Sequence, residues 1–150
     1  MDFLPINIRV SNRKIVIIGG GKVAAQKLQV LTRTSANIYV YANAVCEEIK
    51  SMDLTWEELP YDPSQLTDAF LVFACTDAKD VNRRIAGDAQ KSGITVNVAD
   101  DPQACGFTSP AIWFNDSMCV AVSSDGKNAR RSVDWRNAIR EWGEHDPTLR

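Results

Sequence analysis

Three consecutive glycines, Gly19, Gly20 and Gly21, stand between an apolar β-branched run and a segment whose apolar residues have helical spacing. We expect Gly19 to allow a tight bend from strand to helix and Gly21 to let the backbone approach a pyrophosphate closely. The small side chain of Ala24 would let the helix pack near the strand. Because phosphates bind at helix N-termini, this pattern indicates a dinucleotide-binding turn, and a purely structural βα turn is the alternative.

The residues after the second expected strand bear on which dinucleotide would bind. Enzymes that use NAD often carry an Asp or Glu about 20 residues after the glycines, where the carboxylate binds the ribose hydroxyls. This chain has Asn43 near that place, and the amide of Asn43 can still hydrogen-bond a ribose. No Lys or Arg stands between Arg33 and Lys50 to hold the extra phosphate of NADP. The sequence therefore favours NAD.

Other loops carry polar residues that could take part in chemistry. Thr76 follows a strongly apolar segment and fits a helix N-cap, a cofactor contact or both. Asp101 precedes a proline and is explained by a turn, whereas Asp100 lies closer to the strand end and is better placed for proton transfer. Cys105 has no nearby base in the sequence, which favours a small, buried side chain over a nucleophile.

The hydrophobic pattern predicts the elements that would position these residues. We expect a Rossmann-like α/β fold, a parallel sheet with helices on both faces, because strands and helices alternate up to residue 98. The expected strands are residues 15–18, 37–41, 54–59, 69–75 and 94–98, and the expected helices are residues 22–33, 44–52 and 80–91. A β-hairpin of residues 111–114 and 118–123 should follow, and then an amphipathic helix with Trp135, Ile139 and Trp142 on one stripe. We accordingly expect a nucleotide-binding domain of residues 1–114 and a short extension of residues 115–150.

Composition excludes several classes of function. The four cysteines are widely spaced without a Cys-x-x-Cys pair and His145 is the only histidine, which argues against a disulfide framework, a metal site and a Ser-His-Asp triad. A net charge of −2 gives no reason to expect nucleic-acid binding. The chain has neither a signal peptide nor an apolar run of the ~20 residues that span a bilayer, so we expect a soluble cytoplasmic protein without a membrane partner.

The segment of residues 127–140 is locally basic. Five cations stand against Asp134 alone, and they are Lys127, Arg130, Arg131, Arg136 and Arg140. One interpretation is a solvated helix face, and the other is a site for a polyanionic small molecule.

An ordered set of motifs from residue 2 to about residue 127 resembles the precorrin-2 dehydrogenase family, which includes the N-terminal module of multifunctional siroheme synthases. The motifs are FLPI at residues 3–6, VIIGGGKVA at 16–24, ACTD at 74–77, NVADDP at 97–102 and VAVSSDG at 120–126, with Cys105 and Phe107 between the last two. The resemblance implies NAD-dependent oxidation of precorrin-2 to sirohydrochlorin, joined in some members to the insertion of ferrous iron as a second substrate.

The resemblance also implies roles for residues. Lys22, Val23, Asn43 and Ala44 fall where the family contacts NAD, with Gly19, Gly21 and Thr76 beside them, and Asp100 falls on the family's essential aspartate. The implied substrate carries eight carboxylates, which would give the basic segment a purpose. We expect substrate contacts from Ser124, Lys127, Asn128, Arg130 and Arg131.

The sequence departs from the family after Gly126, where Lys127 and Asn128 replace a Ser-Pro pair that leads into a long helical domain. This departure leaves a second hypothesis open, a non-catalytic module that binds NAD or a tetrapyrrole and acts with a partner enzyme. We also expect a homodimer in which the final helix makes the contact and a substrate cleft is shared. The alternative is that this helix docks on its own Rossmann domain.

Overall fold

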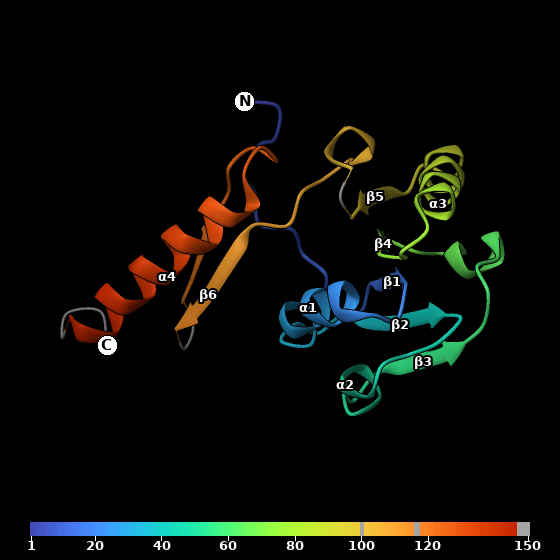
Figure 1. Ribbon diagram of the computed structural model, residues 1–150, viewed down its shortest axis with the longest axis horizontal. Helices are drawn as coiled ribbons and strands as arrows, with labels where there is room; N and C mark the ends of the chain where they lie inside the picture. The colour runs from blue at the N-terminus through green and yellow to red at the C-terminus, as the bar shows by residue number, and fades with distance from the viewer. Residues whose placement is uncertain (100, 116–117, 147–150) are drawn as a thin grey trace. The chain divides into compact units, whose positions relative to one another are not determined.

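The computed structural model describes residues 1–99, 101–115 and 118–146, which form two compact units (Figure 1). One unit is Asn7–Phe107, and the other joins Met1–Ile6 to Thr108–Arg150. Both strands of the expected hairpin therefore group with the final helix, whereas the sequence placed the boundary between residues 114 and 115. Each unit has its own packing and is described separately.

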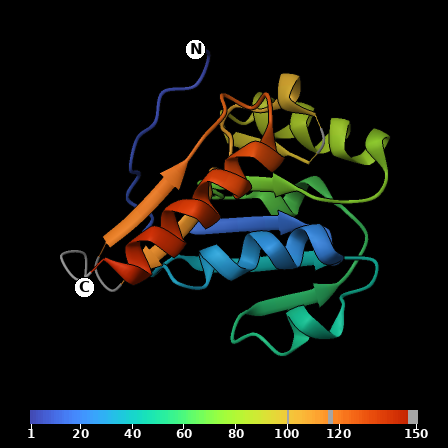
Figure 2. The same cartoon turned by 60° about the vertical axis from the view of Figure 1, so that its left-hand side comes forward.

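The unit Asn7–Phe107 contains a sheet of five parallel strands in the order β3-β2-β1-β4-β5, which run side by side in Figure 2. The strands are β1 (Lys14–Ile18), β2 (Asn37–Ala42), β3 (Thr55–Glu58), β4 (Leu71–Ala74) and β5 (Thr95–Val98). The helices are α1 (Lys22–Leu31), α2 (Glu47–Lys50) and α3 (Lys79–Lys91), with short 3₁₀ helices η1 (Pro63–Leu66) and η2 (Pro102–Ala104). The expected Rossmann-like fold is confirmed.

Alternation along the central strands divides the core between the two faces of the sheet. Ile15 and Ile17 of β1 pack in one cluster with Leu28 of α1, whereas Val16 packs in a second cluster with Ile85 of α3. All these side chains are fully buried. Because β1 and β4 are covered on both faces, they read as continuous apolar runs, as buried parallel strands do.

One local expectation was wrong in extent. The helix expected over residues 44–52 is only α2, because Val45 and Cys46 are held in a loop by bonds to neighbouring elements. Before β4, the short helix η1 is capped by Asp62, which accepts a hydrogen bond from the Ser64 amide and completes a capping box with Gln65. The strand β3 lies at the edge of the sheet, and every one of its residues is exposed.

The second unit is an antiparallel hairpin of β6 (Ala111–Asn115) and β7 (Met118–Val122) packed against α4 (Ala129–His145). The guanidinium of Arg136 donates a hydrogen bond to the Ile112 carbonyl at 2.8 Å. The Trp113 ring occupies the space beside Gly143, where a Cβ would lie 2.5 Å from the ring. The face of α4 on the hairpin therefore carries Arg136 and Gly143, and the tryptophans Trp135 and Trp142 are 57% and 61% exposed.

Among the described residues, none of the helices has the length and apolar character that crossing a bilayer requires. Within the same residues, no three His, Cys, Asp or Glu side chains gather into a group that could hold a metal ion.

Candidate functional site

The carboxyl ends of the parallel strands meet at one edge of the sheet. Ile18 at the end of β1 is in register with Tyr41 of β2 and Ala74 of β4. Ala74 is in turn in register with Val98 at the end of β5. The loops that follow these strands hold the predicted residues Gly19, Asn43 and Thr76, so the structure brings them to one edge, where ligands of open α/β sheets bind.

At two positions of the glycine turn, neighbouring backbone leaves no room for a side chain. Gly19 has φ = +132°, and a Cβ on Gly19 would overlap the Cys75 carbonyl oxygen and lie 3.1 Å from the Thr76 nitrogen. A Cβ on Gly20 would overlap the Ala44 carbonyl oxygen and lie 2.9 Å from the Cα of Val45. The bend expected at Gly19 is confirmed, and the need for glycine at position 20 is an addition, since the sequence assigned that residue no role.

Gly21 differs because no atom lies within 4 Å of the place where its Cβ would be. Gly21 is the N-cap of α1 without a side-chain hydrogen bond, and no acidic residue stands in the first turn. The first amides of a helix have no partner inside it and carry the positive end of its dipole. Lys22 and Val23 are exposed there, whereas Ala24 is buried. The open space and the unsatisfied amides fit the phosphates of a dinucleotide.

The loop after β2 is fixed at two points. The Cys46 amide donates to the Gly20 carbonyl at 2.9 Å, and the Val45 amide donates to the Glu58 carboxylate at 3.0 Å. Val45 is buried in the core, while Asn43 and Ala44 are exposed. In the part of the chain that the structure describes, the Asn43 side chain makes no hydrogen bond. Its amide is therefore available to a ligand at this edge.

Glu58 is a site residue that the sequence did not identify. It ends β3, is in register with Ala42 of β2, and lies 3.3 Å from the Lys50 ammonium. The Val45 amide and then Lys50 lower the pKa of the Glu58 carboxyl. An acid therefore stands at the end of the third strand, whereas Asn43 follows the second. The adjacent acids Glu57 and Glu58 in the predicted strand of residues 54–59 were the available signal.

Thr76 is tied to Asn82 of α3. The Thr76 amide and hydroxyl both donate to the Asn82 side-chain oxygen, at 3.1 and 2.7 Å, and the Asn82 amide donates to the Thr76 carbonyl at 2.9 Å. Of the roles left open for Thr76, that of helix N-cap is excluded, because Ala78 occupies that position and donates its amide to the Thr76 hydroxyl. Because the hydroxyl, the amide and the carbonyl of Thr76 all have partners within the protein, a cofactor would contact Thr76 by packing against it.

The loop after β5 folds around a thiol. The Cys105 Sγ accepts a hydrogen bond from the Val98 amide at 3.1 Å and lies 3.3 Å from the carbonyl oxygens of Val98 and Asp101. Burial raises the pKa of the Cys105 thiol. A thiol with a raised pKa is a poor nucleophile, which favours the structural interpretation. Asp100, the predicted catalytic residue, lies outside the described residues.

Three of the five residues predicted to bind substrate instead have partners within the protein, in the loop before α4 or in its first turn. Asn128 is the N-cap and accepts a hydrogen bond from the Arg131 amide at 2.9 Å, while the Ser124 hydroxyl accepts from the Asn128 amide at 2.9 Å. The Lys127 ammonium lies 2.8 Å from the buried carboxylate of Asp125. The exposed cations Arg130 and Arg131 remain, and the Arg131 guanidinium lies 5.5 Å from the centre of the Trp135 ring.

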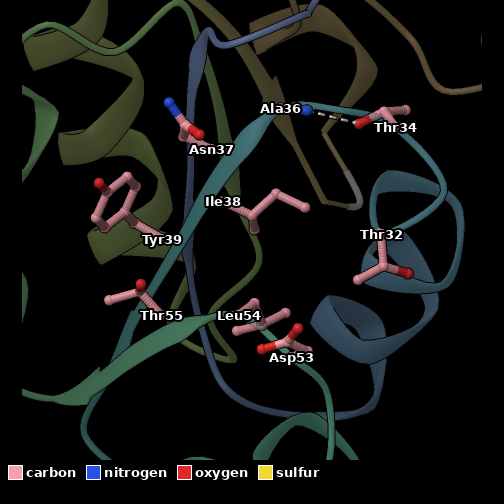
Figure 3. A pocket seen from close by; sticks show the side chains of 9 residues that line it. All are labelled: Thr32, Thr34, Ala36, Asn37, Ile38, Tyr39, Asp53, Leu54 and Thr55. Carbon is pink, nitrogen blue, oxygen red and sulfur yellow. Dashed lines mark hydrogen bonds between the residues drawn. The ribbon is translucent and has the colours of Figure 1, made fainter.

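A pocket of about 410 Å³ lies at the opposite edge of the sheet (Figure 3). Asn37 at the start of β2 and Thr55 at the start of β3 line this pocket, together with Asp53. The predicted site residues follow the strands instead, at their carboxyl ends. The pocket is therefore separate from the candidate site.

Comparison with known proteins agrees with this geometry. Residues 6–111 match the model of a family described as "Putative NAD(P)-binding". The matched segment contains the glycine turn and the loops after all five parallel strands.

Curated relatives are similar over most of the chain. A siroheme synthase of Photorhabdus laumondii is 37% identical over 131 residues, which cover 85% of this chain. A siroheme synthase of Nitrosomonas europaea is 37% identical over 131 residues, and one of Sodalis glossinidius is 38% identical over 130 residues, each covering 84% of this chain. The chain spans about 28% of the length of each of these relatives.

A solved structure supports the fold. The chain aligns with a structure named SirC, precorrin-2 dehydrogenase, with a TM-score of 0.78 and 19% sequence identity. The alignment covers 96% of this chain and 72% of the other.

Proposed function

Because this chain belongs to the NAD(P)-binding family that its residues 6–111 match, we propose that it binds NAD and oxidises precorrin-2 to sirohydrochlorin in siroheme biosynthesis. The observation that carries the proposal is the open helix N-terminus at Gly21, at the same edge of the sheet as the exposed Asn43. The 37% identity to a siroheme synthase, over 85% of this chain, supports the choice of substrate.

The residues of the glycine turn and of the next loop would hold the cofactor. The backbone at Gly19, Gly21, Lys22 and Val23 would face the phosphates, and Lys22 would add a positive charge. In the adjacent loop, Asn43 and Ala44 would meet the ribose, and Thr76 would complete the edge through packing contacts. NAD, when bound, accepts the hydride that oxidation of the macrocycle releases.

Proton transfer falls to Asp100 in this proposal. Oxidation of the macrocycle also releases a proton, which a carboxylate at the end of β5 can take. Insertion of ferrous iron, as a further substrate, would require loss of protons from pyrrole nitrogens, so one aspartate could serve both steps. Arg130 and Arg131 would pair with substrate carboxylates, because charge-assisted hydrogen bonds orient such a ligand.

We further propose that the chain acts as a cytoplasmic homodimer. Trp135 and Trp142 are seven residues apart, so their exposed rings lie on one face of α4. They support an interface there, since contiguous exposed apolar patches mark interaction sites. The cytoplasm is where a water-soluble dinucleotide and a polycarboxylate substrate would meet.

The decisive experiment supplies purified protein with NAD and precorrin-2. We expect NADH to form together with the absorption spectrum of sirohydrochlorin. An absence of turnover above the spontaneous rate, where a known family enzyme works, would overturn the dehydrogenase proposal.

One observation favours a second candidate, a binding module without catalysis. Ser124, Lys127 and Asn128 are engaged in capping and ion pairing at the start of α4, which leaves fewer groups for substrate. A module would bind NAD or a tetrapyrrole saturably without forming NADH. If neither ligand changed the melting temperature, the module would be excluded as well.

A further inference from the structure

Glu58 occupies a particular place relative to the expected ribose position. It is the last residue of β3 and is in register with Ala42, the last residue of β2. In dinucleotide-binding folds the residues just after β2 meet the ribose that carries the 2′-hydroxyl in NAD and the 2′-phosphate in NADP. The Glu58 carboxylate accepts a hydrogen bond of 3.0 Å from the Val45 amide of that loop.

The loop that Glu58 holds also contacts the phosphate-binding turn. Gly20 packs against Ala44 and Val45, and the Gly20 carbonyl accepts the Cys46 amide at 2.9 Å. Residues 43–46 are thus fixed by Glu58 on one side and by the glycine turn on the other. A shift of the Val45 amide would move both the ribose contacts and the wall of the turn.

Charge at this place favours a ribose without a 2′-phosphate. The Val45 amide and Lys50 lower the pKa of the Glu58 carboxyl, so Glu58 is negatively charged at neutral pH. The cation beside it, Lys50, is engaged by Glu58 at 3.3 Å and by Glu47 at 3.5 Å, and its ammonium also lies 5.5 Å from the centre of the Trp56 ring. No other Lys or Arg occurs in the sequence after Arg33 and before Lys79.

We infer that Glu58 is a positioning and specificity residue for the cofactor, which holds the 43–45 loop in place and disfavours NADP. The inference rests on the proposed NAD binding and adds the residue that selects the dinucleotide. Glu58 acts in two separable ways. By accepting a hydrogen bond from the Val45 amide, Glu58 orders the 43–45 loop. Its negative charge repels a 2′-phosphate and pairs with the Lys50 ammonium.

Dissociation constants of NAD and NADP, measured by calorimetry on the full chain, separate these two effects. Glu58→Gln keeps an oxygen for the Val45 amide but removes the charge. We expect near-parental affinity for NAD and a roughly tenfold smaller preference for NAD over NADP. Glu58→Ala removes both effects, so its affinity for NAD should also fall by roughly three- to tenfold.

Two further variants provide controls. Glu57→Gln removes the same charge from the preceding residue of β3, whose side chain points to the other face of the sheet, and should leave the preference nearly unchanged. Adding Lys50→Ala to Glu58→Gln should restore part of the preference, because the released ammonium is no longer available to a 2′-phosphate.

The outcomes test the role of Glu58 separately from the proposed NAD binding on which it rests. A parent protein that binds neither dinucleotide would overturn the proposed function and the inference together. A parent that binds NAD while Glu58→Gln leaves the preference unchanged would overturn the inference alone. If Glu58→Ala fails to fold, Glu58→Gln and its Lys50 double variant still decide the question.

Discussion

Thr76 and Asn82 are joined by three hydrogen bonds that connect the end of β4 to the first turns of α3. Asn82 is buried, and its side chain satisfies both backbone polar groups of Thr76. The nitrogen of Thr76 lies 3.1 Å from where a Cβ of Gly19 would be. The hydrogen-bonded pair of Thr76 and Asn82 therefore also borders the glycine turn. Asn82 therefore connects the stability of the sheet edge to the shape of the cofactor site.

Asn82→Ala tests this connection. Leaving the Thr76 amide and carbonyl without partners should lower the free energy of unfolding by about 1–3 kcal/mol, as measured by urea denaturation. NAD affinity should fall as well, because Thr76 would no longer be held in place beside the glycine turn. Arg83→Ala, at an exposed neighbour on the same helix, is the control and should change neither quantity. Parental stability in Asn82→Ala would contradict the assigned role.

Gly20 and Gly21 should respond differently to the same substitution. Gly20→Ala forces a methyl group into the Ala44 carbonyl and should cost about 1–3 kcal/mol of stability through overpacking. Gly21→Ala places its methyl in open space, so the fold should persist while the methyl obstructs the phosphates and weakens NAD binding. Thermal unfolding with and without NAD distinguishes the two. A Gly21→Ala protein with parental NAD affinity would remove Gly21 from the site.

The apolar runs and the glycines were sufficient to predict the sheet and the edge where the site lies. Ile15 to Ile18 are buried on both faces, and Gly19 adopts the positive φ that a strand-to-helix bend requires. These features are local, since each depends on residues adjacent in sequence.

The residues that sequence reasoning missed depend on contacts between separate elements. Glu58 bonds an amide 13 residues earlier in the chain, and Gly20 is required by the approach of Ala44. Asn128 was assigned to substrate although it caps a helix, because capping and ligand-binding residues share the same polar types. A single sequence does not fix which loops approach one another, so these roles follow only from the three-dimensional fold.

The surroundings of the Asp125 carboxylate predict how the stability of the fold depends on pH. It has a positive φ, accepts hydrogen bonds from the amides of Asp2 and Phe3 at 2.8 and 2.9 Å, and lies 2.8 Å from the Lys127 ammonium. Lys127, followed by the Phe3 amide, lowers the pKa of the Asp125 carboxyl from 3.8 to about 2. Since the folded value lies below the unfolded one, Asp125 stabilises the fold above pH of about 4, and this contribution is lost as pH falls towards 2.

Asp125→Asn isolates that charge, because asparagine tolerates the same positive φ. We expect a lower melting temperature than the parent at neutral pH, and a difference that shrinks as pH falls from about 4 towards 2. Asp134→Asn, on the exposed surface of α4, is the matched control. A difference that stays constant across this range would mean that the carboxylate charge is not what holds residues 2 and 3.

Asp100→Asn tests the proposed proton acceptor. The substitution keeps the size of the side chain and removes its basicity, so turnover of precorrin-2 should fall by roughly 10² or more. NAD affinity should stay nearly unchanged, because the cofactor contacts come from other loops. Asp101→Asn is the control on the neighbouring carboxylate. Equal turnover in Asp100→Asn and the parent would exclude Asp100 from the mechanism.

The proposed homodimer depends on an exposed surface of α4. Trp135 and Trp142 are 57% and 61% exposed while the hairpin occupies the face that carries Arg136 and Gly143. Burying such a ring contributes roughly 1.5–3 kcal/mol, which makes a second copy of the chain a favourable cover. Light scattering at micromolar concentration should give twice 16.6 kDa for the parent, and the Trp135→Gln/Trp142→Gln double variant should give 16.6 kDa. A parent that remains at 16.6 kDa with NAD and tetrapyrrole present would exclude the homodimer.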